Sequence, residues 1–105
     1  MIVEMRTYKL KPGTRPRILD VFVKSLLPEC KRIGMKVAGP FPSVEDNVTV
    51  FWMRAFPDAA AREKMSNAFY GGKAWANELS DVFMPNMESY TVTAVEMPED
   101  AIKWG

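Results

Sequence analysis

The chain has 105 residues, of which 48% are hydrophobic and 26% charged, as expected for one ordinary globular domain spanning residues 1–105. Its fourteen Lys and Arg residues nearly balance its thirteen Asp and Glu residues, so we expect no nucleic-acid partner, and no apolar run reaches the roughly 18 residues of a membrane span. Histidine is absent and Cys30 is the only cysteine, which excludes histidine-dependent catalysis, most zinc sites and an intramolecular disulfide. We therefore expect no metal and no cofactor. Because the first residues also lack a signal-peptide pattern, we expect a reducing, cytoplasmic location.

The first half of the chain predicts a strand, a helix and a second strand. Residues 2–10 alternate between two faces, as in a strand, and a Lys-Pro-Gly turn ends them. Apolar residues then recur at helical spacing over residues 14–33, with a kink expected at Pro28 and an end at Gly34. Residues 35–42 contain two prolines that cannot donate ladder hydrogen bonds, so this strand is expected at a sheet edge.

The second half predicts a strand, a divided helical unit and a last strand. The expected elements are a strand at residues 48–56, helices at 59–70 and 73–83, and a strand at 87–97. Gly71 and Gly72 separate the two helices, and Pro85 is expected to stop the second one. The order βαββαβ favours an α+β, ferredoxin-like fold: a four-stranded antiparallel sheet with both helical units on one face.

The two faces of this sheet differ in character. One face carries charged and aromatic residues, among them Glu4, Arg6, Tyr8, Trp52, Arg54, Phe56 and Tyr90. The other carries uncharged residues, namely Val3, Met5, Phe51, Met53 and Ala55. Because charged groups are costly beneath a helix layer, we expect the helices to cover the uncharged face. The aromatic face would then be buried against a second copy, in a homodimer or a higher oligomer.

Short motifs along the chain resemble those of a known family. They are Glu4-Met-Arg6-Thr-Tyr8, Leu10-Lys11-Pro12-Gly13, Gly39, Phe56-Pro57-Asp58, Arg62-Glu63, Trp75 and Glu88. Over about residues 2–97 the chain resembles the NIPSNAP family. The resemblance implies a dimeric α/β barrel, in which two sheets face each other, and a biochemical role that is poorly defined. Related families on this fold include cofactor-independent monooxygenases, isomerases, lyases and haem proteins. This chain has no histidine, and because its first residues do not read as a targeting presequence we expect no mitochondrial role.

Glu4, Arg6 and Tyr8 alternate along one strand, so they project to one side. Arg6 could orient an acidic or carbonyl-bearing ligand, with Tyr8 as proton donor and Glu4 as base. The alternative is that Glu4 and Arg6 form an ion pair that fixes the dimer or the strand register.

Trp52, Arg54 and Tyr90 could line a pocket for a flat aromatic molecule, with Arg54 binding an anionic group. The alternative is that they form the core of the dimer interface. Three functions follow: a protein that binds a small aromatic or acidic molecule between the sheets of a homodimer, a cofactor-free monooxygenase or isomerase, or a structural protein. No catalytic residue is assigned.

Overall fold

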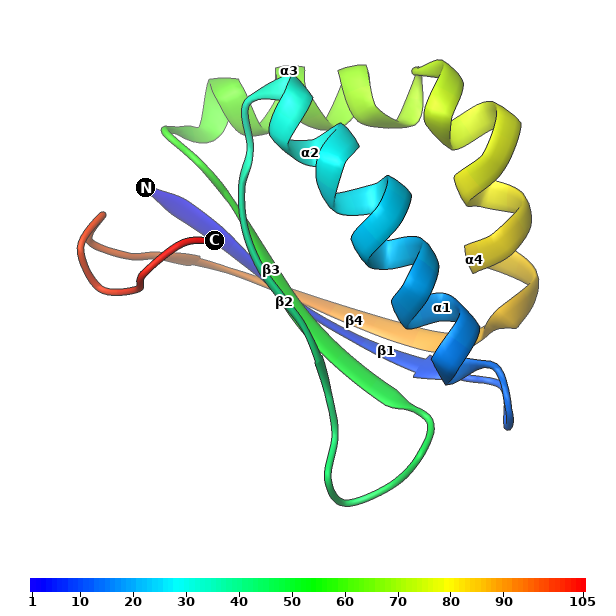
Figure 1. Ribbon diagram of the computed structural model, residues 1–105. Helices are drawn as coiled ribbons and strands as arrows, with labels where there is room; N and C mark the ends of the chain where they lie inside the picture. Colours follow the sequence, from blue (N-terminus) through cyan, green and yellow to red (C-terminus); the bar gives the residue numbers. More distant parts are fainter.

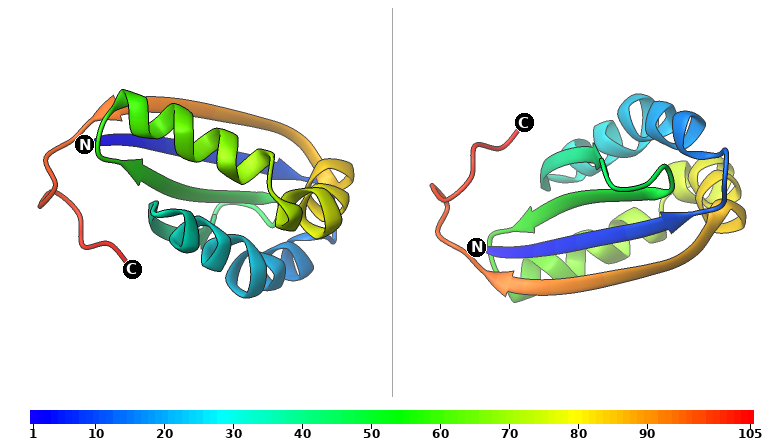
Figure 2. Two further views of the ribbon diagram at one scale, coloured as in Figure 1. Left: turned by 90° about the horizontal axis from the view of Figure 1, so that it is seen from above. Right: turned by 90° about the horizontal axis from the view of Figure 1, so that it is seen from below.

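The structure is a computed structural model that describes residues 1–105. Its strands are β1 (Ile2–Leu10), β2 (Lys36–Pro42), β3 (Thr49–Phe56) and β4 (Met87–Glu96), which form one antiparallel sheet in the order β2-β3-β1-β4. Its helical segments are α1 (Arg15–Val21), η1 (Phe22–Leu26), α2 (Leu27–Ile33), α3 (Ala59–Tyr70), η2 (Trp75–Leu79) and α4 (Ser80–Asn86). All of them lie on one side of the sheet (Figure 1 and Figure 2). The chain therefore has the α+β, ferredoxin-like fold that its sequence predicts.

The first helical unit runs without interruption from Arg15 to Ile33, although it contains Pro28. The segment η1, just before Pro28, is a π-helix, in which the Leu27 N–H donates to the Phe22 carbonyl five residues back. This wider turn lies where the proline removes a backbone donor, so the helix departs from α geometry next to the residue at which a kink is expected. Gly34 ends the unit with a φ of 111°, which is why glycine suits this position.

Most of the other predicted boundaries are confirmed. The Asp58 side chain caps α3 by accepting a hydrogen bond from the Ala61 N–H at 2.7 Å. Strand β2 lies at an edge of the sheet, as its prolines predict. The prediction for Pro85 is wrong: it lies inside α4, which continues to Asn86. In this last turn the Asn86 amide donates to the Val82 carbonyl at 2.7 Å, which supports the helix end.

The predicted assignment of the two sheet faces is reversed in the structure. The face that carries Tyr8, Trp52 and Phe56 packs beneath the helices, against residues such as Ile18 and Phe22. The charged residues of this face, Glu4, Arg6 and Arg54, are buried with it. The expectation failed because it assessed the burial of each charge separately. In the structure Glu4 pairs with an arginine on its own strand, one on β3 and one on α3.

The uncharged face points away from the helices. Four of its residues form a small buried cluster: Val3, Ala38, Met53 and Ala55. The C-terminal segment contributes Met97, Ile102 and Trp104 to this cluster, and it runs near the N-terminus at one end of the sheet (Figure 2). No helix of the chain combines the length and apolar character needed to cross a bilayer.

The homodimer stays a prediction. Its original reason, an uncovered aromatic face, does not hold because helices cover that face. On the opposite face Met5 and Phe51 remain partly exposed, and β4 is an edge strand with mostly exposed side chains.

Candidate ligand-binding cavity

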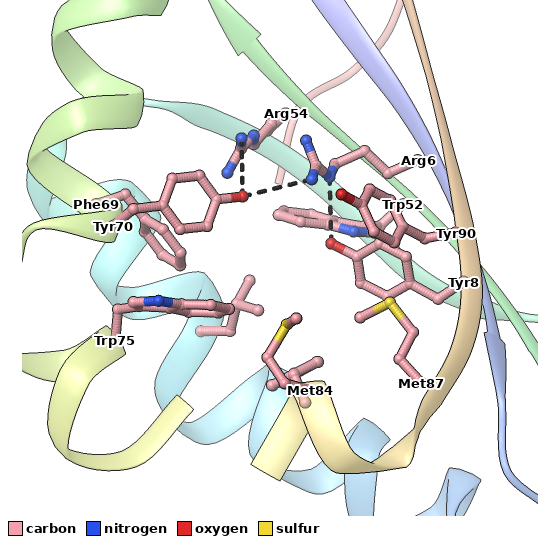
Figure 3. Close-up of a pocket in the computed structure, with 12 residues that line it drawn as sticks. Arg6, Tyr8, Trp52, Arg54, Phe69, Tyr70, Trp75, Met84, Met87 and Tyr90 are labelled. Carbon is pink, nitrogen blue, oxygen red and sulfur yellow. Dashed lines mark hydrogen bonds between the residues drawn. The ribbon is translucent and has the colours of Figure 1, made fainter. Parts of the chain in front are cut away.

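A cavity of about 220 Å³ lies between the sheet and the helices (Figure 3). Its apolar wall comes mainly from the helical segments and the start of β4: Leu26, Phe69, Trp75, Phe83, Met84 and Met87. Its opposite end is formed by side chains from β1, β3 and α3, namely Arg6, Tyr8, Trp52, Arg54 and Tyr70. The cavity therefore has one polar, cationic end and one apolar end.

Glu4 does not line the cavity, but its carboxylate binds the arginines of the cationic end. Its Oε1 accepts hydrogen bonds from Arg6 Nη1 and Arg54 Nε, both at 2.6 Å, and its Oε2 accepts one from Arg62 Nε at 2.8 Å. The strand register creates this arrangement, since Glu4 lies directly opposite Arg54 in the β1–β3 pair. Charge-assisted bonds of this length fix both guanidiniums that line the cavity.

The Glu4 carboxyl is almost fully buried, with 3% of the residue exposed. Burial by itself raises the pKa of this carboxyl, but Arg54, Arg62 and Arg6 outweigh that effect and hold the pKa below its usual value. Glu4 is therefore ionised at neutral pH and is a poor general base. It serves as an anchor for the arginines.

Arg6 and Arg54 also donate to two phenol oxygens at the cavity. Arg6 Nε donates to the Tyr8 hydroxyl at 3.2 Å, and Arg6 Nη2 donates to the Tyr70 hydroxyl at 3.4 Å. Arg54 Nη2 donates to the same Tyr70 hydroxyl at 3.3 Å. The Tyr70 oxygen therefore lies between the two guanidiniums (Figure 3).

Hydrogen-bond donors outnumber acceptors at this end of the cavity. Each guanidinium carries five N–H groups, of which Arg6 uses three and Arg54 two within the chain. The buried Trp52 Nε1–H has no hydrogen-bond partner. The Tyr8 and Tyr70 hydroxyls both accept bonds from arginine and donate none. A group that accepts hydrogen bonds would satisfy these donors.

The cluster also carries excess positive charge. Three guanidiniums surround one carboxylate, which leaves two net positive charges, and Arg6 and Arg54 are only 8% and 2% exposed. Buried charge without a counter-charge is costly. Burial also raises the pKa of the Tyr8 phenol, an effect that Arg6 opposes only in part, so Tyr8 stays neutral and supplies no counter-charge. An anionic ligand would reduce this imbalance.

Aromatic rings shape the cavity. The Arg54 guanidinium carbon lies 5.8 Å from the Trp52 ring centre and 5.4 Å from that of Tyr70, within cation–π range. Tyr70 meets Trp75 edge-to-face, with ring centres 5.0 Å apart. Tyr90 packs edge-to-face on Tyr8 at 6.2 Å and is 57% exposed, which places it at the cavity mouth.

Both π-helical segments contribute to the cavity. Leu26, the last residue of η1, and Trp75, the first residue of η2, both line it. A π turn rotates the residues that follow it relative to an α-helix, and such turns occur frequently at functional sites. Both helical units therefore depart from α-helical geometry next to the cavity.

A sequence model of one family matches most of the chain. It is that of the NIPSNAP family, and it matches residues 3–98. The chain belongs to the NIPSNAP family. A search of curated proteins finds no match.

Solved structures with the same fold include members of this family. An uncharacterized NIPSNAP domain protein from Burkholderia xenovorans is 18% identical, with a TM-score of 0.81, and the match covers 98% of this chain and 100% of that one. A NIPSNAP family protein with unknown function from Agrobacterium tumefaciens is 21% identical, with a TM-score of 0.81 and coverage of 96% and 91%. An antibiotic biosynthesis monooxygenase is 15% identical, with a TM-score of 0.72 and coverage of 93% and 99%. At these identities the likeness shows the fold alone.

The NIPSNAP domain brings together the six candidate ligand-binding residues that its sequence predicts. Five of the six line the cavity: Arg6, Tyr8, Trp52, Arg54 and Tyr90. Glu4 does not line it but binds two of its arginines. The predicted location is wrong, because these side chains lie between the sheet and the helices of one chain and not between the sheets of two chains.

Sequence reasoning missed the helical half of this NIPSNAP cavity. Tyr70 was not among the candidate residues, and Trp75 entered only as one of the family motifs, although both line the cavity. A signal was present, since Tyr70 directly precedes the Gly71-Gly72 break, where a helix ends and its last side chain can turn toward a neighbouring element. Cys30 is buried, and burial raises the pKa of its thiol to about 12, as expected for an inert cysteine.

Proposed function

We propose that this NIPSNAP domain binds a small acidic molecule with a flat apolar body in the cavity between its sheet and its helices. The observation that carries the proposal is the pair of buried guanidiniums, Arg6 and Arg54, at one end of an otherwise apolar cavity. A carboxylate or enolate placed there would accept hydrogen bonds from N–H groups that have no partner and would offset part of the excess charge.

The apolar end limits the size and shape of the ligand. A cavity of about 150 Å³ lined by apolar side chains is large enough for benzene. The volume of about 220 Å³ found here therefore suits one ring with its acidic substituent. Flat rings also fit the edges and faces that Trp75 and Tyr8 present.

Calorimetric titration with benzoate and with its neutral isostere benzamide tests the proposal. Benzoate should bind, and benzamide should bind at least about tenfold more weakly, because a charge-assisted hydrogen bond is worth roughly 1.5–3 kcal/mol. Binding of neither compound, or of both equally, would contradict the proposal as tested with this ring size and charge.

Arginine variants locate the binding site within the chain. Arg6→Met should abolish benzoate binding, because Arg6 lines the cavity. Arg62→Met is the matched control, since Arg62 binds the same Glu4 carboxylate but does not line the cavity. Urea unfolding of both variants separates lost binding from lost folding. Equal loss of affinity in two folded variants would indicate that binding depends on Glu4 and not on the cavity.

A cofactor-free enzyme is the second function that the cavity supports. The observation that favours it is the Tyr8 hydroxyl, which accepts from Arg6 and keeps its own proton available inside the cavity. A structure named as an antibiotic biosynthesis monooxygenase shares the fold. Oxygen consumption with phenolic substrates, compared between the wild type and Tyr8→Phe, tests this function. Turnover that survives the substitution unchanged would exclude Tyr8 as the proton donor.

A further inference from the structure

The Tyr70 hydroxyl occupies the position between the two cavity arginines where an acidic group would bind. Arg6 Nη2 lies 3.4 Å and Arg54 Nη2 3.3 Å from its oxygen. Both nitrogens point to this one atom (Figure 3). It is the one point in the cavity at which both guanidiniums donate to the same neutral group.

These two contacts are long compared with the other bonds of the same arginines. Arg6 and Arg54 each donate to the Glu4 carboxylate at 2.6 Å. Charge-assisted N–H···O bonds are typically about 2.7–2.9 Å long. The neutral phenol oxygen of Tyr70 is therefore a weak partner for two cations, and an anionic oxygen in its place would form shorter and stronger bonds.

Tyr70 is also placed where it can leave this position. It is the last residue of α3 and is 40% exposed, whereas its neighbour Phe69 is 2% exposed and fixed in the core. Its hydroxyl proton has no acceptor within the chain, so the only hydrogen bonds that its departure breaks are the two long ones, although its ring also leaves Arg54 and Trp75. Gly71 and Gly72 follow, and at each of them a Cβ would lie 2.9 Å from a carbonyl oxygen of α3, so glycine suits this tight turn next to Tyr70.

We infer that Tyr70 fills the anion position when no acid is bound and turns toward solvent when an acid binds. The inference rests on the proposed function and makes its ligand class more specific: a monoanion whose oxygen, from a carboxylate or an enolate, bridges Arg6 and Arg54. Tyr70 thus competes with the ligand. It is a specificity-determining residue, because a neutral ligand gains little by replacing one neutral oxygen with another.

Benzoate titration of three proteins tests this inference: the wild type, Tyr70→Phe and Ser66→Ala. Tyr70→Phe keeps the ring and its packing on Trp75 but removes the competing oxygen, so it should bind benzoate about threefold to tenfold more tightly. Ser66→Ala also removes a hydroxyl from α3, but Ser66 makes no side-chain hydrogen bond and does not line the cavity, so its affinity should equal that of the wild type.

Each outcome separates this inference from the proposed function. Tighter binding by Tyr70→Phe, with Ser66→Ala equal to a wild type that binds, supports the competing role. Unchanged or weaker binding by Tyr70→Phe, with a wild type that binds, overturns the role of Tyr70 and leaves the proposed function standing. Binding by none of the three proteins overturns the proposed function and the inference with it.

A crystal structure of the wild type with benzoate gives a second test. The carboxylate should lie between Arg6 and Arg54, and the Tyr70 ring should have turned away from both. A carboxylate found elsewhere, or one that binds beside an unmoved Tyr70, overturns the inference.

Discussion

The two faces of the sheet are buried in different ways. The face beneath the helices contains a carboxylate, two cavity arginines and a cavity, whereas the opposite face has an apolar cluster formed by Val3, Ala38, Met53 and Ala55. The charged face is nevertheless the one that the fold covers with its helices. The comparison shows that charge on a strand does not indicate an exposed face when the charged groups lie opposite each other in the sheet.

The physical reason lies in how the charges compensate one another. An isolated buried ion is very costly, but a carboxylate that accepts three charge-assisted bonds offsets much of the cost for itself and its partners. The remaining excess of positive charge is concentrated at the cavity. The helix-covered face thus contributes both to the core and to the candidate binding site, while the opposite face contributes only packing.

The largest effect is expected from removing the shared counter-ion of the helix-covered face. Glu4→Gln should lower the free energy of unfolding by about 3–5 kcal/mol, because it leaves buried guanidiniums without a counter-charge. Urea unfolding monitored by circular dichroism measures the loss. Glu88→Gln, an exposed carboxylate on β4, is the matched control and should change stability by less than about 0.5 kcal/mol. Equal small losses in both variants would show that the cluster contributes no stability.

The same carboxylate should make stability depend on pH. The pKa of Glu4 is lower in the folded protein than its ordinary value of 4.5, so the folded state favours the ionised form. Its contribution is fully present above about pH 4.5 and is lost as the pH falls through the lower, folded-state pKa. The free energy of unfolding should therefore fall less steeply below pH 4.5 in Glu4→Gln than in the wild type. Identical slopes in the two proteins would contradict the assigned pKa direction.

Local patterns were enough to predict the secondary structure and the fold. Strand alternation in residues 2–10, the capping Asp58 and the prolines of the edge strand all act over a few residues, and the structure confirms them. Alternation also placed Glu4, Arg6 and Tyr8 on one face. It could not show which face the helices cover, because that depends on ion pairs between residues far apart in the chain, such as Glu4 and Arg54.

The helical half of the cavity was not predictable for a related reason. The position of Tyr70 depends on how α3 packs over the sheet and on the tight turn at the two glycines that follow it. The π segments that contain Leu26 and Trp75 were not predicted from the helical spacing of apolar residues either. Sequence reasoning therefore identified the strand-borne residues of the site and missed those carried by helices.

The smallest effect concerns how the two faces are covered. Val50 beneath the helices and Val3 on the opposite face are both fully buried, so Val→Ala at either position should cost about 2 kcal/mol. The two losses of stability should depend on different parts of the chain. Val3 belongs to the cluster that the C-terminal segment covers with Ile102 and Trp104, whereas Val50 belongs to the core beneath the helices.

A double-mutant cycle with Trp104→Ala tests this difference. Once Trp104 is removed, part of the surface around Val3 is open to water, so Val3→Ala should cost at least about 0.5 kcal/mol less than in the wild type. Val50→Ala should cost the same in both backgrounds, because Trp104 does not pack against its cluster. Urea unfolding of the two single valine variants, Trp104→Ala and the two double variants measures both coupling energies. Coupling of Trp104 to Val50 but not to Val3 would mean that the C-terminal segment does not cover the face opposite the helices.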